Sequence, residues 1–162
     1  MFEQTGVPSA EMIMRKFPTV ERINRGKVAV VECYKRIPCN PCQTACRFGA
    51  IEVGSDINNI PELNAEACTG CGLCVSRCPG LAIMIVDGSA DPQSVDIQIP
   101  YEFLPLPEKG ETVRALDRAG AFVCMATVVD VKNPAAFDRT PVICIRVPRG
   151  HMYSVRNIAL EA

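Results

Sequence analysis

The stretch CTGCGLCVSRCP, residues 68–79, decides the fold. Its four cysteines follow the spacing C-x2-C-x2-C-x3-C and precede a proline, which is the ligand run of bacterial-type [4Fe–4S] sites. Three thiolates on one tight loop can bind three irons of one cube. The fourth cysteine, which we expect to begin a short helix, points toward a second cube. Gly70 and Gly72 keep the loop small, so that backbone N–H groups can face the cluster sulfurs.

An earlier cysteine group, at residues 33–46, repeats this run at an offset of 32 residues, apart from its first member. The two groups together contain Cys33, Cys39, Cys42, Cys46, Cys68, Cys71, Cys74 and Cys78. A repeat that carries metal ligands implies duplicated halves facing each other. Strict repetition would place a cysteine at position 36, where Arg36 stands instead. If Cys33 cannot reach the first cluster, that site becomes a three-iron cluster or takes a non-cysteine ligand.

Residues 26–87 resemble a bacterial-type two-cluster ferredoxin, because both cysteine runs fit that family's pattern. The resemblance implies two [4Fe–4S] clusters with crossed ligation. Cluster one would be bound by Cys33, Cys39, Cys42 and Cys78. Cluster two would be bound by Cys68, Cys71, Cys74 and Cys46.

Zinc binding and disulfide formation explain the pattern of cysteines less well than iron–sulfur clusters do. Zinc binds C-x2-C pairs, but two zinc sites would not need the crossed C-x3-C spacing. Disulfides are rare in a reducing cytosol, and the first residues lack an apolar run of signal-peptide length. Cys124 and Cys144 stand alone in apolar runs and are expected to be buried structural thiols.

The predicted fold class is α+β, with a ferredoxin-like domain at residues 26–90 and a small SH3-like or KOW-like β-barrel at 95–160. Residues 1–25 form a lead segment in which Pro8-Ser9-Ala10 marks a helix start. The polar, turn-rich stretch 87–92 is the predicted boundary. Because all eight cysteines precede it, a chain cut after Asp91 is expected to keep both clusters.

Composition excludes several classes of partner. The chain has 17 Lys and Arg against 18 Asp and Glu, a net charge of −1, so it lacks the basic surface typical of nucleic-acid binders. Residues 88–162 hold 8 basic and 9 acidic side chains, with few aromatics for base stacking. No apolar run reaches the roughly 20 residues that span a bilayer. We therefore expect a cytoplasmic protein with neither nucleic-acid nor membrane partners.

The sequence contains no catalytic motif of its own, so the clusters imply one-electron transfer between partners. The segment VAVVECYKRIPCNPCQTACRFGAI, residues 28–51, also resembles the ferredoxin-like small subunits of FAD-dependent amino-acid or amine dehydrogenases of the sarcosine oxidase and proline dehydrogenase type. That resemblance implies a hetero-oligomer with FAD-containing subunits. The alternatives are a free two-cluster ferredoxin with a C-terminal extension, and a binding module with structural or sensory clusters.

Overall fold

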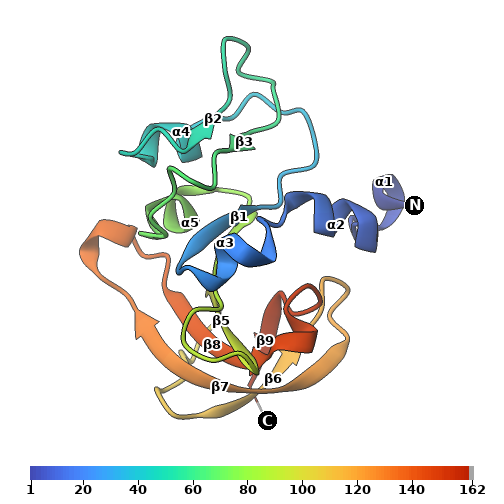
Figure 1. Ribbon diagram of the computed structural model, residues 1–162, viewed down its shortest axis with the longest axis vertical. Helices are drawn as coiled ribbons and strands as arrows, with labels where there is room; N and C mark the ends of the chain where they lie inside the picture. Colours follow the sequence, from blue (N-terminus) through green and yellow to red (C-terminus); the bar gives the residue numbers. More distant parts are fainter. Residues whose placement is uncertain (161–162) are drawn as a thin grey trace.

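One antiparallel sheet of seven strands runs through most of the chain, which the computed structural model describes over residues 1–160 (Figure 1). The strand order is β1-β4-β5-β8-β7-β6-β9. The strands are β1 (Val28–Val31), β4 (Ile83–Asp87), β5 (Ser94–Pro100), β6 (Thr112–Leu116), β7 (Phe122–Lys132), β8 (Val142–Pro148) and β9 (Asn157–Ala159). A second sheet pairs β2 (Ile51–Glu52) with β3 (Glu62–Leu63).

The helices within residues 1–160 are all short. They are α1 (Phe2–Thr5), α2 (Ala10–Lys16), α3 (Val20–Asn24), α4 (Pro41–Ala45) and α5 (Leu73–Arg77), with 3-10 turns η1 (Ala135–Phe137) and η2 (Arg149–His151). The predicted helix start is confirmed, because Ser9 Oγ accepts a 3.3 Å hydrogen bond from Met12 N–H as the N-cap of α2. None of these helices has the length and apolar character needed to cross a membrane.

The 32-residue repeat is visible in the cysteine-rich half. Helices α4 and α5 are related by that offset and pack against each other. The strands of the two halves are exchanged: Val28 of β1 lies opposite Val86 of β4. Likewise Ile51 of β2 lies opposite Leu63 of β3. Each half therefore completes its sheet with a strand of the other, as expected for duplicated halves facing each other.

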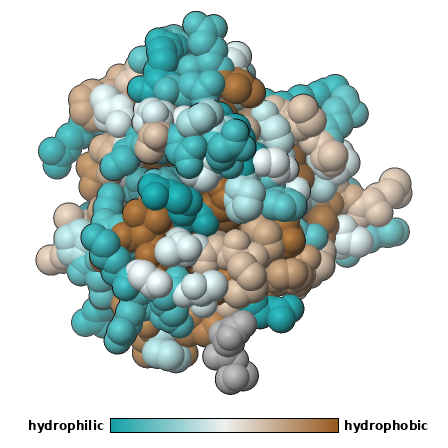
Figure 2. All heavy atoms as spheres, turned by 60° about the horizontal axis from the view of Figure 1, so that its bottom comes forward, coloured by the Kyte–Doolittle hydropathy of each residue, from teal (hydrophilic) through white to brown (hydrophobic). Residues whose placement is uncertain are grey.

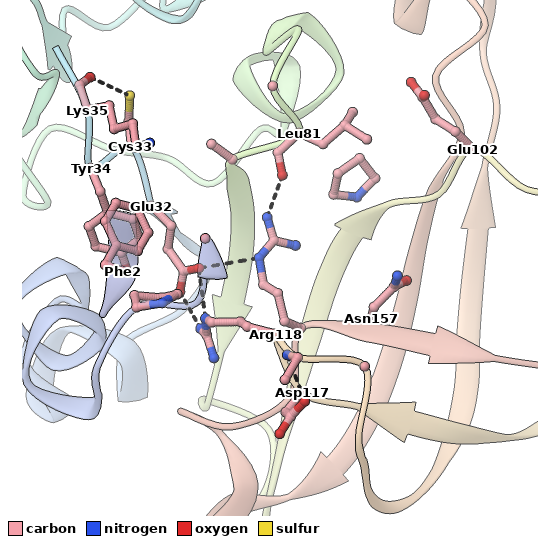
Figure 3. A pocket seen from close by; sticks show the side chains of 18 of the residues that line it. Phe2, Glu32, Cys33, Tyr34, Lys35, Leu81, Glu102, Asp117, Arg118 and Asn157 are labelled. Carbon is pink, nitrogen blue, oxygen red and sulfur yellow. Dashed lines mark hydrogen bonds and ion pairs between the residues drawn. The ribbon is translucent and has the colours of Figure 1, made fainter. Parts of the chain in front are cut away.

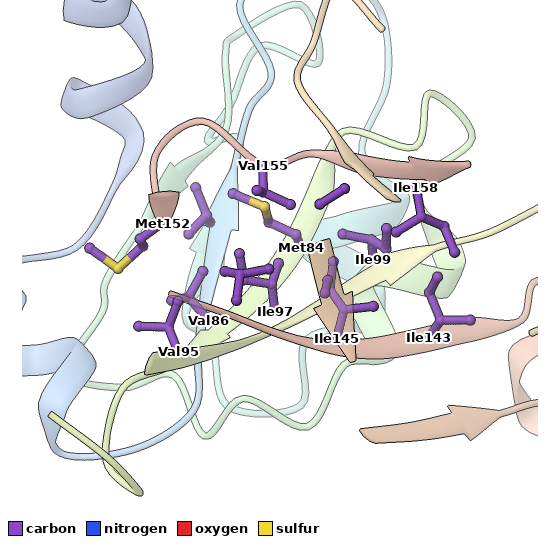
Figure 4. Packing of buried hydrophobic residues seen from close by; sticks show 14 of the residues in the cluster. Met84, Val86, Val95, Ile97, Ile99, Ile143, Ile145, Met152, Val155 and Ile158 are labelled. Carbon is purple, nitrogen blue, oxygen red and sulfur yellow. The ribbon is translucent and has the colours of Figure 1, made fainter. Parts of the chain in front are cut away.

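Strands β1 and β4 are buried on both faces, since every residue from 28 to 31 and from 83 to 86 is at most 3% exposed. Alternate side chains point to opposite faces of a strand. One face packs with the C-terminal strands (Figure 4) and contributes Val28, Val30, Met84 and Val86. The other face packs against the cysteine-bearing helices and contributes Ala29, Val31, Ile83 and Ile85. These two strands are thus shared by two hydrophobic cores.

The sheet continues across the boundary predicted at residues 87–92. Strand β5 pairs directly with β4, with Ile85 opposite Gln98 and Asp87 opposite Asp96. The polar stretch 88–93 is therefore the connection of two adjacent strands. Aspartate and glycine favour a hairpin turn as readily as a linker, so composition alone could not distinguish the two.

The α+β class is confirmed, whereas an SH3-like or KOW-like barrel is not. Within residues 1–160 the strand order runs from β1 at one edge to β9 at the other, and no pairing closes it. The edge of β5 that a closed barrel would need is occupied by β4. A bulge between Val128 and Asp130 bends β7, and the C-terminal strands curve around their core without closing. Over this end of the molecule hydrophobic side chains reach the surface among hydrophilic ones (Figure 2).

The shared core changes the expected effect of a cut after Asp91. Removing residues 92–162 would expose Val28, Val30, Met84 and Val86 to water. At about 1.5–3 kcal/mol for each buried side chain, the loss is about 6–12 kcal/mol, as large as the whole stability of a typical domain. We predict that the shortened chain neither folds nor retains iron, as measured by circular dichroism and iron content beside the full chain. A shortened chain with its full iron content would show that the two cores are separable.

Candidate metal centre

Each of the two helices α4 and α5 carries the cysteines of one repeat. Cys42 lies in the first turn of α4 and Cys74 in the first turn of α5, and both are buried. Cys46 and Cys78 directly follow the last helical residue, in extended conformation. The prediction that the fourth cysteine begins a helix is therefore wrong: it ends one. Its extended backbone still directs the chain away from the helix that bears the preceding cysteine.

One set of four cysteines lines a single cavity. Cys46, Cys68, Cys71 and Cys74 face it together with apolar residues such as Ile51 and Ile85. Burial raises the pKa of the Cys74 thiol to about 12, and the other three cysteines add to the rise. A thiolate is therefore costly here without a cation, which is the situation that metal binding relieves. These are the four residues predicted for cluster two.

The remaining four cysteines of the two groups are also neighbours. Burial raises the pKa of Cys33, and the nearby Cys78 and Cys39 raise it further. The pKa of Cys42 is raised by burial and, to a smaller extent, by the same two neighbours. The structure thus brings together Cys33, Cys39, Cys42 and Cys78, the residues predicted for cluster one. Their role as ligands stays a prediction, Cys33 included.

Backbone N–H groups point at several of these sulfurs. Ala50 N donates to Cys46 Sγ at 3.3 Å. At the equivalent position of the repeat, Ala82 N donates to Cys78 Sγ at 3.4 Å. Cys68 Sγ accepts from both Ala29 N and Gly70 N at 3.4 Å. Such donors stabilise thiolates that bind metal and help to set the potential of a cluster.

The spacing of these side chains differs from that of a single-ion site. Within residues 1–160 no three His, Cys, Asp or Glu side chains lie close enough together to hold one metal ion between them. A four-iron cube holds its thiolates farther apart than one ion does, because each thiolate binds a different iron. Both donor sets consist of sulfur alone, each contains one buried cysteine, and backbone N–H groups point at sulfurs of both, which fits such a cube.

The two isolated cysteines lie on strands of the C-terminal sheet. Cys144 of β8 is buried, as predicted, and burial raises its pKa to about 12. Cys124 of β7 is only half-buried. Neither lies opposite another cysteine in its strand pairing, since Cys144 faces Gln98 and Cys124 faces Ala115.

Sequence reasoning missed two arginines that reach the cysteine loops. Arg22 and Arg156 hydrogen-bond to backbone carbonyls of these loops from α3 and from the residue before β9. Arginine is usually solvated, and neither residue belongs to a motif. The sequence did indicate that a buried partner was needed. Glu32 follows the apolar run VAVV immediately before Cys33, and a carboxylate at that place needs a buried partner.

Comparison with known proteins finds matches to the cysteine-rich part of the chain. Residues 35–82 match the family described as 4Fe-4S dicluster domain. The chain is similar to the "Ferredoxin-type protein NapF" of Escherichia coli (strain K12), with 38% identity over 52 residues, 31% of this chain and 32% of that protein. The NapF of Haemophilus influenzae (strain ATCC 51907 / DSM 11121 / KW20 / Rd) is 41% identical over 54 residues, 32% of this chain and 31% of the relative.

A further relative is named as part of a complex. It is a subunit of the "Na(+)-translocating ferredoxin:NAD(+) oxidoreductase complex" of Acetobacterium woodii (strain ATCC 29683 / DSM 1030 / JCM 2381 / KCTC 1655 / WB1), and it is 40% identical over 45 residues, 28% of this chain and 13% of that protein. The chain spans about a third of the length of the NapF proteins and less of this third relative. No solved structure matches it. The match to a dicluster domain, together with two groups of cysteines, shows that the cofactors are two [4Fe–4S] clusters.

Gly70 offers a test of how tightly the second loop is held. Its φ is +67°, and a Cβ there would lie 2.7 Å from the carbonyl carbon and oxygen of Lys27. Gly72 has a similar φ of +82° but nothing within 4 Å of a Cβ. We predict that Gly72→Ala lowers the free energy of unfolding by about 1–2 kcal/mol through backbone strain alone. Gly70→Ala should cost more, about 3–5 kcal/mol, and also lower the iron content. Equal effects of the two variants would show that the contact with Lys27 is unimportant.

Proposed function

We propose that this chain is an iron–sulfur electron-transfer subunit of a multi-subunit, flavin-dependent oxidoreductase of the cytoplasm. In this proposal it relays electrons one at a time from a flavin on a partner subunit. The observation that carries the electron-transfer role is the gathering of eight cysteines into two neighbouring sets against β1 and β4. Each bound cluster accepts and donates single electrons at a potential that its surroundings set.

We assign the ligands as two crossed sets. Cluster one is held by Cys33, Cys39, Cys42 and Cys78, and cluster two by Cys68, Cys71, Cys74 and Cys46. The protein supplies thiolates, N–H donors to their sulfurs, and an apolar wall that limits the access of water. That wall includes Val31, Ile83 and Ile85, all at most 3% exposed.

The two sets differ in how they can be approached from outside, which supports a relay with separate entry and exit. Cys33 lines a groove of about 880 Å³ between the first helix, the cysteine loop and the C-terminal sheet (Figure 3). Cys71 of the other set is exposed, and Phe48 beside it is 53% exposed. Electrons can therefore reach the first set from the groove and leave from the second set at the surface, or move in reverse.

The groove has the features of a protein contact. Exposed apolar side chains stand on its walls, with Ile37 47% and Phe103 63% exposed. Leu104, which follows Phe103 in the chain, is 88% exposed. Exposed apolar side chains clustered at one place mark interaction sites. We place the electron-donating partner at this groove.

That the partner is a flavin subunit is supported by the resemblance of residues 28–51 to the small subunits of FAD-dependent dehydrogenases. A relative whose name states that it is a subunit of an oxidoreductase complex supports the hetero-oligomer.

Isolation of the native chain under anaerobic conditions tests the assignment of a flavin partner directly. A flavoprotein that co-purifies, and whose substrate reduces the clusters, is the expected result. A chain isolated alone with both clusters intact would favour the free ferredoxin, and clusters that dithionite cannot reduce would favour a structural role.

Substitution of Cys33 tests the ligand assignment. In the full chain reconstituted without oxygen we expect about eight iron atoms. Cys33→Ala should convert cluster one to a three-iron cluster or abolish it, while cluster two survives, so that iron falls to between about four and seven atoms. Cys124→Ala, which changes a half-buried thiol outside both sets, is the matched control and should leave the iron content unchanged. An EPR spectrum of Cys33→Ala identical to that of the unaltered chain would exclude Cys33 as a ligand.

Phe103 tests the docking site. Phe103→Glu places a charge on the apolar wall of the groove and should slow substrate-driven reduction of the clusters by about tenfold or more, the size expected for an interface hot spot. Reduction by dithionite needs no docking and should be unaffected. Phe122→Glu is the control, because Phe122 is also exposed, at 49%, but does not line the groove. Equal effects of both changes would place the partner elsewhere.

A further inference from the structure

A buried arginine from the N-terminal segment holds the chain beside cluster two. Arg22 of α3 is 8% exposed. Its Nη2 donates to the carbonyl oxygen of Cys68 at 2.7 Å, and its Nε donates to that of Ala65 at 2.8 Å. The same guanidinium also donates to the carbonyls of Gly26 and Lys27 at 3.1 Å. Arg22 thus joins the strand entry at 26–27 to the loop that begins with Cys68.

A second buried arginine, from the C-terminal end, does the same beside cluster one. The Arg156 side chain is 13% exposed, and its Nη2 donates to the carbonyl oxygen of Leu81 at 2.6 Å. Its Nε lies 3.5 Å from a carboxylate oxygen of Glu32. Leu81 follows Cys78 by three residues and Glu32 directly precedes Cys33. Arg156 therefore connects the two chain segments that bring Cys33 and Cys78 together.

Arg118 completes the second arrangement. Its guanidinium pairs with both carboxylate oxygens of Glu32, with Nε at 2.9 Å, and its side chain is 7% exposed. Arg118 Nη1 donates to the carbonyl oxygen of Tyr153 at 2.7 Å, which fixes the pair to the C-terminal part. Two buried guanidinium groups here face one carboxylate, so one positive charge stays in excess.

Neither arrangement balances its charge with carboxylates alone. Within residues 1–160 Arg22 lies in no ion pair with an acidic side chain, because Glu66, the carboxylate that its charge affects, is exposed and pairs with Arg25. The pair of arginines has only Glu32. Buried charge is costly unless a compensating charge lies nearby. A [4Fe–4S] cluster bound by four thiolates is anionic, and more so when reduced. Such a cluster beside each site provides the missing negative charge.

We propose that Arg22 and Arg156 are positioning residues, each dedicated to one cluster. Arg22 holds the loop of cluster two, and Arg156, together with Arg118, holds the two segments of cluster one. Each fixes the backbone that carries the ligands and raises the reduction potential of its own cluster by placing positive charge beside it. The inference rests on the ligand assignment proposed above, but it needs no partner protein.

The test is a reciprocal one on the isolated full chain, with potentials measured by EPR during titration with dithionite. Cys33→Ser first identifies which signal belongs to cluster one. Arg156→Gln should then lower the reduction potential of cluster one and leave that of cluster two unchanged. Arg22→Gln should lower the reduction potential of cluster two and leave that of cluster one unchanged. Arg146→Gln is the control, since Arg146 pairs with Asp96 at 2.7 Å and is 46% exposed. If either variant shifted the reduction potentials of both clusters, or of neither cluster, the proposal would be overturned.

Lysine variants separate charge from hydrogen-bonding geometry. Arg156→Lys and Arg22→Lys keep the charge but lose the planar group that reaches several acceptors. We expect the potential of the corresponding cluster to stay near that of the unaltered chain. Iron should be lost from that cluster to a chelator roughly tenfold faster or more, the usual effect of removing a residue that orients a metal ligand.

Loss of a cluster or of the fold in the glutamine variants also tests whether each arginine serves one cluster. Selective loss of one cluster in a glutamine variant, with the other cluster and the circular dichroism retained, supports the assignment of that arginine. Loss of both clusters together with the fold would show a general structural role and contradict it. An unchanged spectrum in Cys33→Ser would show that the ligand assignment itself is wrong. Failure to find a flavin partner would leave all these readouts intact.

Discussion

The burial of β1 and β4 on both faces is the constraint on which the rest of the structure depends. A strand with one solvated face could belong to a small ferredoxin-like unit alone, but Val28, Val30, Met84 and Val86 pack on the C-terminal strands. Their alternating neighbours form the wall behind the cysteines. Because side chains alternate along a strand, a shift of one residue in the pairing of β1 with β4 would exchange the two cores. The cysteine sets are therefore held in place by packing that begins outside them.

This arrangement gives the segments without cysteine ligands a part in the redox unit. Helix α3 delivers Arg22 to the loop of Cys68, and the C-terminal sheet delivers Arg118 and Arg156 to the strand end before Cys33. The same C-terminal part forms one wall of the groove beside Cys33. In the proposed account, partner docking, ligand positioning and the reduction potential of cluster one thus depend on a single sheet. The exposed Cys71 gives a partner a separate approach to the proposed cluster two.

Much of this was accessible from sequence, because cysteine spacing reports directly on local geometry. The offset of 32 residues predicted duplicated halves, and α4 and α5 obey it. The helix start at Ser9 was likewise a local feature, whereas the expectation that the fourth cysteine begins a helix was wrong. What sequence could not show depends on long-range pairing. The turn at 88–93 is compatible with a linker or a hairpin, and only the pairing of β5 with β4 decides between them. The partners of Glu32 lie 86 and 124 residues further on, at Arg118 and Arg156, where no periodic pattern points to them.

The crossed sharing of cysteines between two clusters is the central claim, and anomalous diffraction at the iron absorption edge of anaerobically grown crystals tests it most directly. The account predicts two separate iron peaks, one enclosed by Cys68, Cys71, Cys74 and Cys46 and the other by Cys33, Cys39, Cys42 and Cys78. A single iron site, zinc in place of iron, or clusters that each draw all their ligands from one repeat would contradict it.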